Sequence, residues 1–240
     1  MPERIDVHNH FLPRLDDGCS TISESFTCIG AMRNAGYRRF FLTPHTGPTD
    51  MCSIRPEESI EHFHAFTAAA RQAAIDAEFK IGGEVRLSQE LLSRRDLSLA
   101  VTYGITSRYC LVDLWEPDWP RWADETIDWL ISHGRIVVLA HPERMPIMQN
   151  YPALMDRLAE RGVLFQGNLG PLGGSELPAI TQLAESFLRQ GRYFMLGSDC
   201  HRPSHLAARM AGLDRAIELV GGEKVDELTC HNPALIWNSC

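Results

Sequence analysis

Short apolar segments alternate along the chain with longer segments in which apolar residues recur every three or four positions. The short segments are rich in Val, Ile, Leu and Phe, and they predict strands over residues 4–7, 39–43, 78–83, 109–114, 135–140, 163–167 and 193–197. The longer segments predict helices over residues 22–35, 56–77, 89–95, 121–132, 152–161, 177–190 and 204–220. A regular alternation of strands and helices predicts an α/β fold with parallel strands.

Glycine directly follows three of the helical patterns, at Gly36, Gly162 and Gly191, and glycine often ends a helix in this way. The pattern leaves two architectures open, a doubly wound open sheet and a closed barrel. The first predicted strand is not followed by a GxGxxG motif, which argues against a dinucleotide-binding fold. The chain has 240 residues, 44% of them hydrophobic, and no long linker divides it. We therefore expect a single domain over residues 1–240.

The formal net charge and the apolar segments narrow the range of partners. The charge of −8 argues against an extended nucleic-acid-binding surface, because such surfaces cluster Lys and Arg. The first residues, MPERIDVHNH, lack the apolar region of a signal peptide, and no later segment approaches the roughly 18 apolar residues of a membrane span. We expect a cytoplasmic protein without a membrane-spanning segment.

Histidines and carboxylates directly follow or end most of the predicted strands. These residues are His8, His10, Asp17, His45, Glu84, Asp113, His141, Asp199 and His201. In a parallel barrel the carboxyl ends of the strands converge on one face, where barrel enzymes keep their active sites. Burying so many polar groups is costly unless they have partners or bind metals. The sequence therefore predicts a metal centre, and a set of imidazoles and carboxylates without thiolates suits Mn, Fe or Zn.

Other polar residues have simpler interpretations. His62 and His64 also form an HxH pair, but they lie inside a predicted helix, where residues two apart point about 200° away from each other and cannot bind one ion together. We expect both on the helix surface. Asp16 precedes Asp17 and Gly18, and we expect it to shape this turn rather than to bind metal.

Seven segments together resemble a known group of enzymes. They are IDVHNHFLPRLDDG, LTPHTG, IGGEVRLS, YCLVDLWE, LAHPERM, FQGNLG and GSDCHRP, and they span nearly the whole chain. Their order and spacing resemble the polymerase and histidinol phosphatase (PHP) superfamily, and within it the CpsB-like tyrosine-protein phosphatases of bacterial capsule operons. The resemblance implies a distorted (β/α)7 TIM-like barrel of the PHP type. It also implies a centre of two or three metal ions, with Mn as the first expectation.

The resemblance assigns the expected ligands to three sites. The first would be held by His8, His10, Asp199 and a bridging Glu84, the second by Glu84, Asp113 and His141, and the third by Asp17, His45 and His201. Asp113 departs from the pattern, because the capsule phosphatases usually carry glutamate there. The aspartate side chain is shorter by about 1.5 Å, so the second metal is expected to bind more weakly, and Glu116 is an alternative ligand.

Three arginines are candidates for contacting a phosphate. By the same resemblance Arg144, in the segment AHPER, would face the phosphate, since a guanidinium can bind two phosphate oxygens at once. The alternative for Arg144 is a surface salt bridge with Glu143. Family members usually carry a second phosphate-facing arginine several residues after His201, and here Arg202 and Arg209 compete for that role.

The expected function is that of a metal-dependent phosphomonoesterase, in which a metal-bound hydroxide attacks the phosphorus atom. The resemblance implies a protein-tyrosine phosphatase of capsule or exopolysaccharide synthesis. Its partner would be a phosphotyrosine protein, the tyrosine-rich tail of a bacterial tyrosine kinase. A cysteine phosphatase is excluded, because none of the cysteines has arginine at the sixth position after it, as the CX5R loop requires.

Three alternatives remain open at this point. The first is a small-molecule phosphatase such as histidinol phosphatase. The second is a TatD-like or amidohydrolase metal hydrolase, although the segment GSDCH, with histidine two residues after aspartate, suits the PHP pattern better. The third is a non-catalytic module that binds phosphotyrosine or a kinase.

Overall fold

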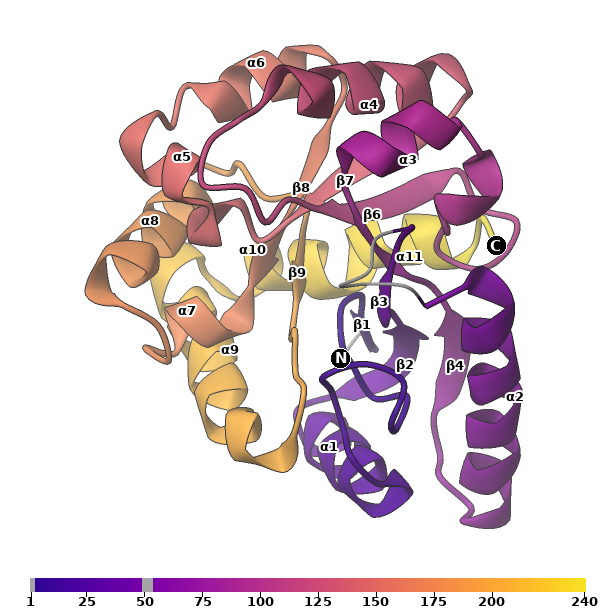
Figure 1. Cartoon of the computed structure of the whole chain (residues 1–240). Coiled ribbons are helices and arrows are strands. Elements are labelled where there is room, and N and C mark those ends of the chain that lie inside the picture. Colours follow the sequence, from indigo (N-terminus) through magenta and orange to yellow (C-terminus); the bar gives the residue numbers. More distant parts are fainter. Residues whose placement is uncertain (1–2, 49–53) are drawn as a thin grey trace.

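The computed structural model describes residues 3–48 and 54–240, in which strands and helices alternate as the hydrophobic pattern predicts (Figure 1). The strands are β1 (Arg4–Asp6), β2 (Tyr37–Leu42), β3 (His45–Thr46), β4 (Glu78–Ile81), β5 (Glu84–Arg86), β6 (Tyr109–Asp113), β7 (Ile136–Ala140), β8 (Leu164–Asn168) and β9 (Met195–Gly197). Every pairing between them is parallel, in the orders β1-β2-β4 and β3-β5-β6-β7-β8-β9.

Backbone hydrogen bonds join the two sheets into one curled surface. The N–H of Gly82 donates to the carbonyl of Leu42 (2.8 Å), and the N–H of Glu84 donates to the carbonyl of Pro44 (2.9 Å). β2 therefore leads into β3, and β4 leads into β5, with a short break in each. A parallel bridge between Asn9 and Cys200 links the chain after β1 to the chain after β9. The predicted α/β class with a parallel sheet is thus confirmed, and the sheet is curled.

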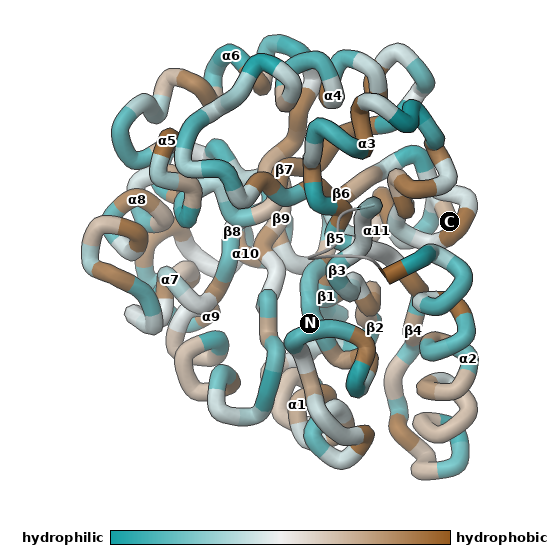
Figure 2. Tube along the Cα trace, in the orientation of Figure 1, coloured by the Kyte–Doolittle hydropathy of each residue, from teal (hydrophilic) through white to brown (hydrophobic). Residues whose placement is uncertain are grey.

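Helices lie around the outside of the strands (Figure 1). They are α1 (Ile22–Asn34), α2 (Pro56–Gln72), α3 (Gln89–Arg94), α4 (Arg121–Ser132), α5 (Pro146–Asn150), α6 (Leu154–Glu160), α7 (Leu169–Leu172), α8 (Pro178–Arg189), α9 (Leu206–Val220), α10 (Gly222–Asp226) and α11 (Asn232–Trp237). In α4, for example, Ala123, Ile127 and Leu130 recur at helical spacing and are buried on one face. Figure 2 shows the result, with hydrophobic colour along β7 and hydrophilic colour on the outer turns of α6.

Several predicted boundaries are wrong. The helix predicted over residues 56–77 ends at Gln72, because Ala74 adopts a left-handed conformation (φ 51°) that stops it. The helix predicted over 152–161 begins only at Leu154, and the strand predicted over 78–83 breaks after Ile81. The pattern predicts no helix after residue 220, yet α10, a π-helical turn (Glu227–His231) and α11 follow there.

The described residues form two apolar clusters, one inside the curled sheet and one between the sheet and the outer helices. Ile5, Phe41 and Val138 belong to the inner cluster, and all three are fully buried. Ile236 and Trp237 of α11 pack against this cluster. The unpredicted C-terminal helix therefore covers part of the sheet interior.

The backbones at the end of α7 and in α9 approach each other so closely that only glycine fits at Gly173 and Gly212. A Cβ atom on Gly212 would lie 1.9 Å from the carbonyl oxygen of Leu169, and one on Gly173 would lie 1.9 Å from that of Ala208. The crossing holds Arg209 of α9 below the end of β9, where its guanidinium donates to the carbonyls of Ser198 (3.0 Å) and Asp199 (2.8 Å). Helix packing thus supports the loop that carries Asp199.

We predict that Gly212→Ala lowers the free energy of unfolding by about 1–3 kcal/mol, because the added methyl group forces α7 and α9 apart. Gly30 in α1 is the matched control, since a Cβ there meets no atom within 4 Å. Gly30→Ala should be neutral or stabilising, by up to about 1 kcal/mol. Urea denaturation of both variants measures the difference, and equal stabilities would contradict the close-packing argument.

Candidate metal centre

The loop after β1 places two histidines in the centre of the site. His8 and His10 are fully buried, and their Nε2 atoms are 3.3 Å apart. The Nδ1 atom of His8 lies 2.7 Å from the side-chain oxygen of Gln166, and the Nδ1 atom of His10 lies 2.7 Å from the carboxylate of Asp16. An acceptor at Nδ1 fixes the ring with its proton on that nitrogen, which leaves Nε2 free to bind a metal.

Glu84, the first residue of β5, is surrounded by imidazoles. Its Oε2 atom lies 2.9 Å from Nδ1 of His45, 3.2 Å from Nε2 of His8 and 3.4 Å from Nε2 of His10. Its Oε1 atom accepts a hydrogen bond from Nε2 of His141 at 2.8 Å. Oε2 is nevertheless buried without a hydrogen-bond partner. Since a buried anionic oxygen without a partner is costly, its setting fits a ligand shared by metal ions.

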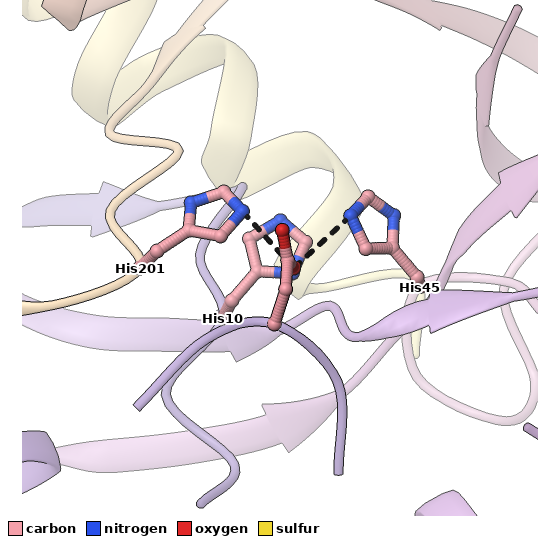
Figure 3. Close-up of side chains that lie close together, drawn as sticks. His10, His45 and His201 are labelled. Atoms are coloured by element: carbon pink, nitrogen blue, oxygen red, sulfur yellow. Dashed lines mark ion pairs between the residues drawn. The ribbon is translucent and has the colours of Figure 1, made fainter. Parts of the chain in front are cut away.

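Within residues 3–48 and 54–240, three sets of side chains have ligand atoms that all lie within 4.8 Å of one another. They are His10 with Asp17, His45 and His201, then His8 with Glu84 and His141, and finally His8 with His10 and Asp199. Figure 3 shows the rings of His10, His45 and His201 gathered together, with ion pairs from the Asp17 carboxylate to His45 and His201, each 3.4 Å. Imidazoles and carboxylates in these numbers suit Mn, Fe or Zn.

The positions of two of these residues require an unusual backbone. His141 and Asp199, which follow β7 and β9, both adopt left-handed conformations, with φ of 32° and 46°. This conformation is costly for residues other than glycine and persists where surrounding structure enforces it. Here the N–H of His141 donates to the carbonyl of Gln166, and the N–H of Asp199 donates to that of His8, both at 2.7 Å.

The electrostatic environment keeps the central carboxylates ionised. Burial alone would raise the pKa of Glu84, but the imidazoles around it, His8 and His45 first, hold that pKa well below its usual range. Burial would also raise the pKa of Asp199, but the positive charge of Arg144 outweighs this effect. The pKa of Asp199 therefore also lies well below its usual range. Both side chains are therefore available as anionic ligands at neutral pH.

Asp113 lies at the edge of this arrangement. Its Oδ1 atom is 3.8 Å from Nδ1 of His141, and it belongs to none of the three sets. Its Oδ2 atom accepts a hydrogen bond from the indole of Trp115. Burial raises the pKa of Asp113. The expected ligands are thus all brought to one end of the sheet, with Asp113 the most distant of them from a ligand set.

Residues that were not predicted from the sequence hold the ligand candidates in place. Gln166 supports His8, and the Asn168 amide donates to the Asp199 carboxylate at 2.8 Å. Asp16 accepts from the N–H of Gly18, as the turn interpretation predicted, but it also supports His10. Polar residues at alternate positions of the segment FQGNLG were the available signal for Gln166 and Asn168.

Arg144 lines a pocket of about 330 Å³ that opens above Glu84, His141 and Asp199. Its guanidinium forms ion pairs with the carboxylates of Asp199 and Glu176. The alternative of a surface salt bridge between Arg144 and Glu143 is wrong. Glu143 is fully buried and accepts hydrogen bonds from the N–H of Asn168 (2.8 Å) and the hydroxyl of Tyr193 (2.9 Å).

The other two arginines lie outside this pocket. Arg209 is buried, with its guanidinium directed to backbone carbonyls of Ser198 and Asp199. Arg202 lies on the other side of Asp17, in a separate hollow, and donates to the Asp17 carbonyl at 3.1 Å. Of the three arginines, Arg144 is therefore the one whose side chain lines the pocket beside the ligand sets.

None of the helices within residues 3–48 and 54–240 combines the length and the apolar character of a membrane span. The fold closely matches a solved structure described as YwqE from Bacillus subtilis and CpsB from Streptococcus pneumoniae, unique metal-dependent tyrosine phosphatases. The TM-score is 0.88 at 24% identity, covering 98% of this chain and 94% of that chain. A structure of a 2-pyrone-4,6-dicarboxylic acid hydrolase from Pseudomonas putida matches less well, with a TM-score of 0.55 and 13% identity.

The sequence itself is similar to curated proteins of the same kind. It is 29% identical over 205 residues to the tyrosine-protein phosphatase YwqE of Bacillus subtilis, covering 82% of this chain and 77% of that protein. It is 24% identical over 241 residues to the tyrosine-protein phosphatase CpsB of Streptococcus pneumoniae, covering 97% of each. Residues 4–238 match the family described as capsular polysaccharide synthesis, CpsB/CapC. Because that match takes in every strand and all the clustered histidines and carboxylates, the chain belongs to the CpsB/CapC family, as its motifs predicted.

Proposed function

We propose that the protein is a metal-dependent protein-tyrosine phosphatase. The observation that carries the proposal is the buried Oε2 atom of Glu84, which faces three imidazole nitrogens without a hydrogen-bond partner. The names of the relatives support the same activity. An anionic oxygen in this setting is suited to bridging cations, and a cluster of cations beside a pocket is suited to binding a phosphate ester.

We propose that the three sets of side chains hold two or three ions, with manganese as the first candidate and iron or zinc as alternatives. His8, His10, Asp17, His45, Glu84, His141, Asp199 and His201 would be the ligands, and Asp113 would contribute from the edge. When bound, such ions lower the pKa of water to about 7 and stabilise the attacking and leaving oxygens of phosphoryl transfer. No cysteine belongs to these sets among the described residues, which fits hydrolysis without a thiol nucleophile.

The proposed role of the chain's own residues begins with orientation. Gln166 and Asp16 hold His8 and His10 so that both Nε2 atoms point into the site. Arg144 lines the pocket and carries the charge that a phosphate requires, so it would bind the phosphoryl oxygens. Its pairing with Glu176, a side chain that is one-quarter exposed, would exchange for the phosphate when substrate binds.

The fold and the biological setting complete the proposal. The curled sheet and the bridge between Asn9 and Cys200 support a distorted (β/α)7 barrel of the PHP type, formed by a single domain over residues 1–240. The substrate would be a phosphotyrosine protein, the tail of a bacterial tyrosine kinase that controls capsule or exopolysaccharide synthesis. A kinase tail that is phosphorylated with ATP inside the cell would present this substrate there, so we propose a cytoplasmic location for the phosphatase.

The proposed activity predicts phosphate release from a phosphotyrosine peptide by protein that has been stripped of metal and reloaded with Mn²⁺, and none by the stripped protein. Loss of a residue that only hydrogen-bonds to a metal ligand typically lowers activity by roughly 10- to 100-fold. His141→Ala should lower kcat/KM by more than this, because it removes a proposed ligand, the imidazole next to Glu84. His64→Ala is the matched control, since His64 lies exposed on α2, and it should retain wild-type activity.

Two results of this assay would contradict the proposal. Preference for histidinol phosphate over the peptide would indicate a small-molecule phosphatase on the same site. Release of phosphate from neither substrate, combined with tight binding of the peptide, would indicate a module that binds phosphotyrosine without hydrolysis.

The positions of the three arginines predict three different effects on peptide hydrolysis. Arg144→Gln should raise KM by about 10- to 100-fold, the size expected for losing charged hydrogen bonds to a phosphate. Arg202→Gln should change KM by less than about fivefold, because this residue is exposed and outside the pocket. Arg209→Gln should lower the melting temperature, because its buried guanidinium supports two carbonyls. Steady-state kinetics and thermal unfolding separate these outcomes, and an unchanged KM in Arg144→Gln would remove Arg144 from the phosphate site.

A further inference from the structure

Trp115 stands at the mouth of the pocket and is held there by three contacts. Trp115 follows Asp113 by two positions in the sequence, and 41% of its surface is exposed to solvent. The indole N–H donates to the carboxylate of Asp113, the guanidinium of Arg86 lies 4.1 Å from the ring centroid, and the ring of His45 meets the indole edge-on at 5.6 Å. Exposed tryptophans usually keep rotational freedom, so an exposed indole fixed in this way is already positioned for a ligand.

The pocket that Trp115 lines has two chemically distinct parts. Its inner part is polar and consists of ligand candidates such as Glu84, His141 and Asp199. Its apolar part is formed by Leu114, Trp115, Met145 and Pro146, of which Trp115 and Pro146 are exposed, and the exposed Glu116 lines the pocket next to them. A molecule that fills both parts would carry an anionic group, with an apolar group bonded directly to it.

The contact with His45 fixes where the indole lies relative to the reaction. His45 belongs to one ligand set and also faces Oε2 of Glu84 at 2.9 Å. Trp115 therefore lies one side chain outward from the ligand cluster. A phosphate bound at the cluster would place the group esterified to it beside the indole.

We propose that Trp115 is a specificity-determining residue, whose indole packs against the aromatic ring of an aryl phosphate ester and so favours such esters over alkyl phosphates. The inference rests on the proposed phosphatase function and names the feature of this chain that selects its substrate class. Aromatic rings pack well against indole, proline and methionine side chains, and the pocket offers all three.

A purely structural role for Trp115 makes a different prediction. If the indole served only to hold Asp113 through its N–H, then removing it would weaken every phosphate ligand alike. Phenylalanine and leucine substitutions separate the two roles, because both remove the N–H but only phenylalanine keeps an aromatic ring. The relative affinity for two ligands that share a head group is a readout that a role in positioning Asp113 would not change.

The test is isothermal titration calorimetry of the Mn²⁺-loaded full chain with phenylphosphonate and with methylphosphonate, which are not hydrolysed and differ only in the attached group. The wild-type protein should bind phenylphosphonate more tightly by about tenfold, equivalent to about 1.4 kcal/mol. Trp115→Phe should retain most of this preference. Trp115→Leu should lose the preference for phenylphosphonate. Its affinity for methylphosphonate should equal that of Trp115→Phe, because both variants lack the indole N–H.

Tyr151→Leu is the matched control, because Tyr151 is also an exposed aromatic residue (57%) but does not line the pocket. It should leave both affinities unchanged. The proposal fails if the wild type shows no preference for phenylphosphonate, or if Trp115→Leu keeps the wild-type preference. If the wild-type protein binds neither phosphonate but releases phosphate from the phosphotyrosine peptide, the inference alone fails; if it does neither, the proposed phosphatase function fails as well.

Discussion

Burial of ionised carboxylates among imidazoles is the constraint on which the rest of the structure depends. Glu84 and Asp199 are almost completely buried, and the transfer of an isolated carboxylate from water into a protein interior is strongly unfavourable. Here each carboxylate faces at least two histidine rings, and Asp199 also faces Arg144. The charges can stay buried only while all of these partners remain in place, so the scaffold must hold side chains from distant segments within a few ångströms.

The fold meets this requirement in two layers. Parallel strands bring the ligand candidates to one end of the sheet, as the carboxyl ends of barrel strands do. A second layer then fixes their orientation, with Gln166 behind His8, Asp16 behind His10, and Asn168 and Arg209 behind Asp199. The second layer reaches the outer helices, because Arg209 belongs to α9 and α9 is held against α7 by the contact at Gly212.

The sequence could predict the alternation of strands and helices and the gathering of the ligand candidates at one end of the sheet, because both depend on local patterns, while metal binding by these residues stays a prediction. Apolar segments of five or six residues mark buried strands, and a histidine or carboxylate at the end of one is conspicuous. It could not predict that Ala74 would end α2 early or that residues 222–237 would form helices, the last of which, α11, packs against the sheet interior, since tertiary packing decides both. The roles of Gln166, Glu143 and Trp115 were missed for the same reason, because each depends on a partner far away in the sequence or on exposure at the pocket.

The proposed metal centre depends most on Glu84 being shared between metal ions. The most direct measurement is the metal content per chain, determined by elemental analysis after equilibration with Mn²⁺ and removal of free ions, for the wild type and for Glu84→Gln. We predict two or three ions in the wild type and the loss of more than one of them in the variant, because Oε2 of Glu84 faces imidazoles from every one of the three ligand sets. A variant that keeps the wild-type content, or that loses a single ion, would contradict it.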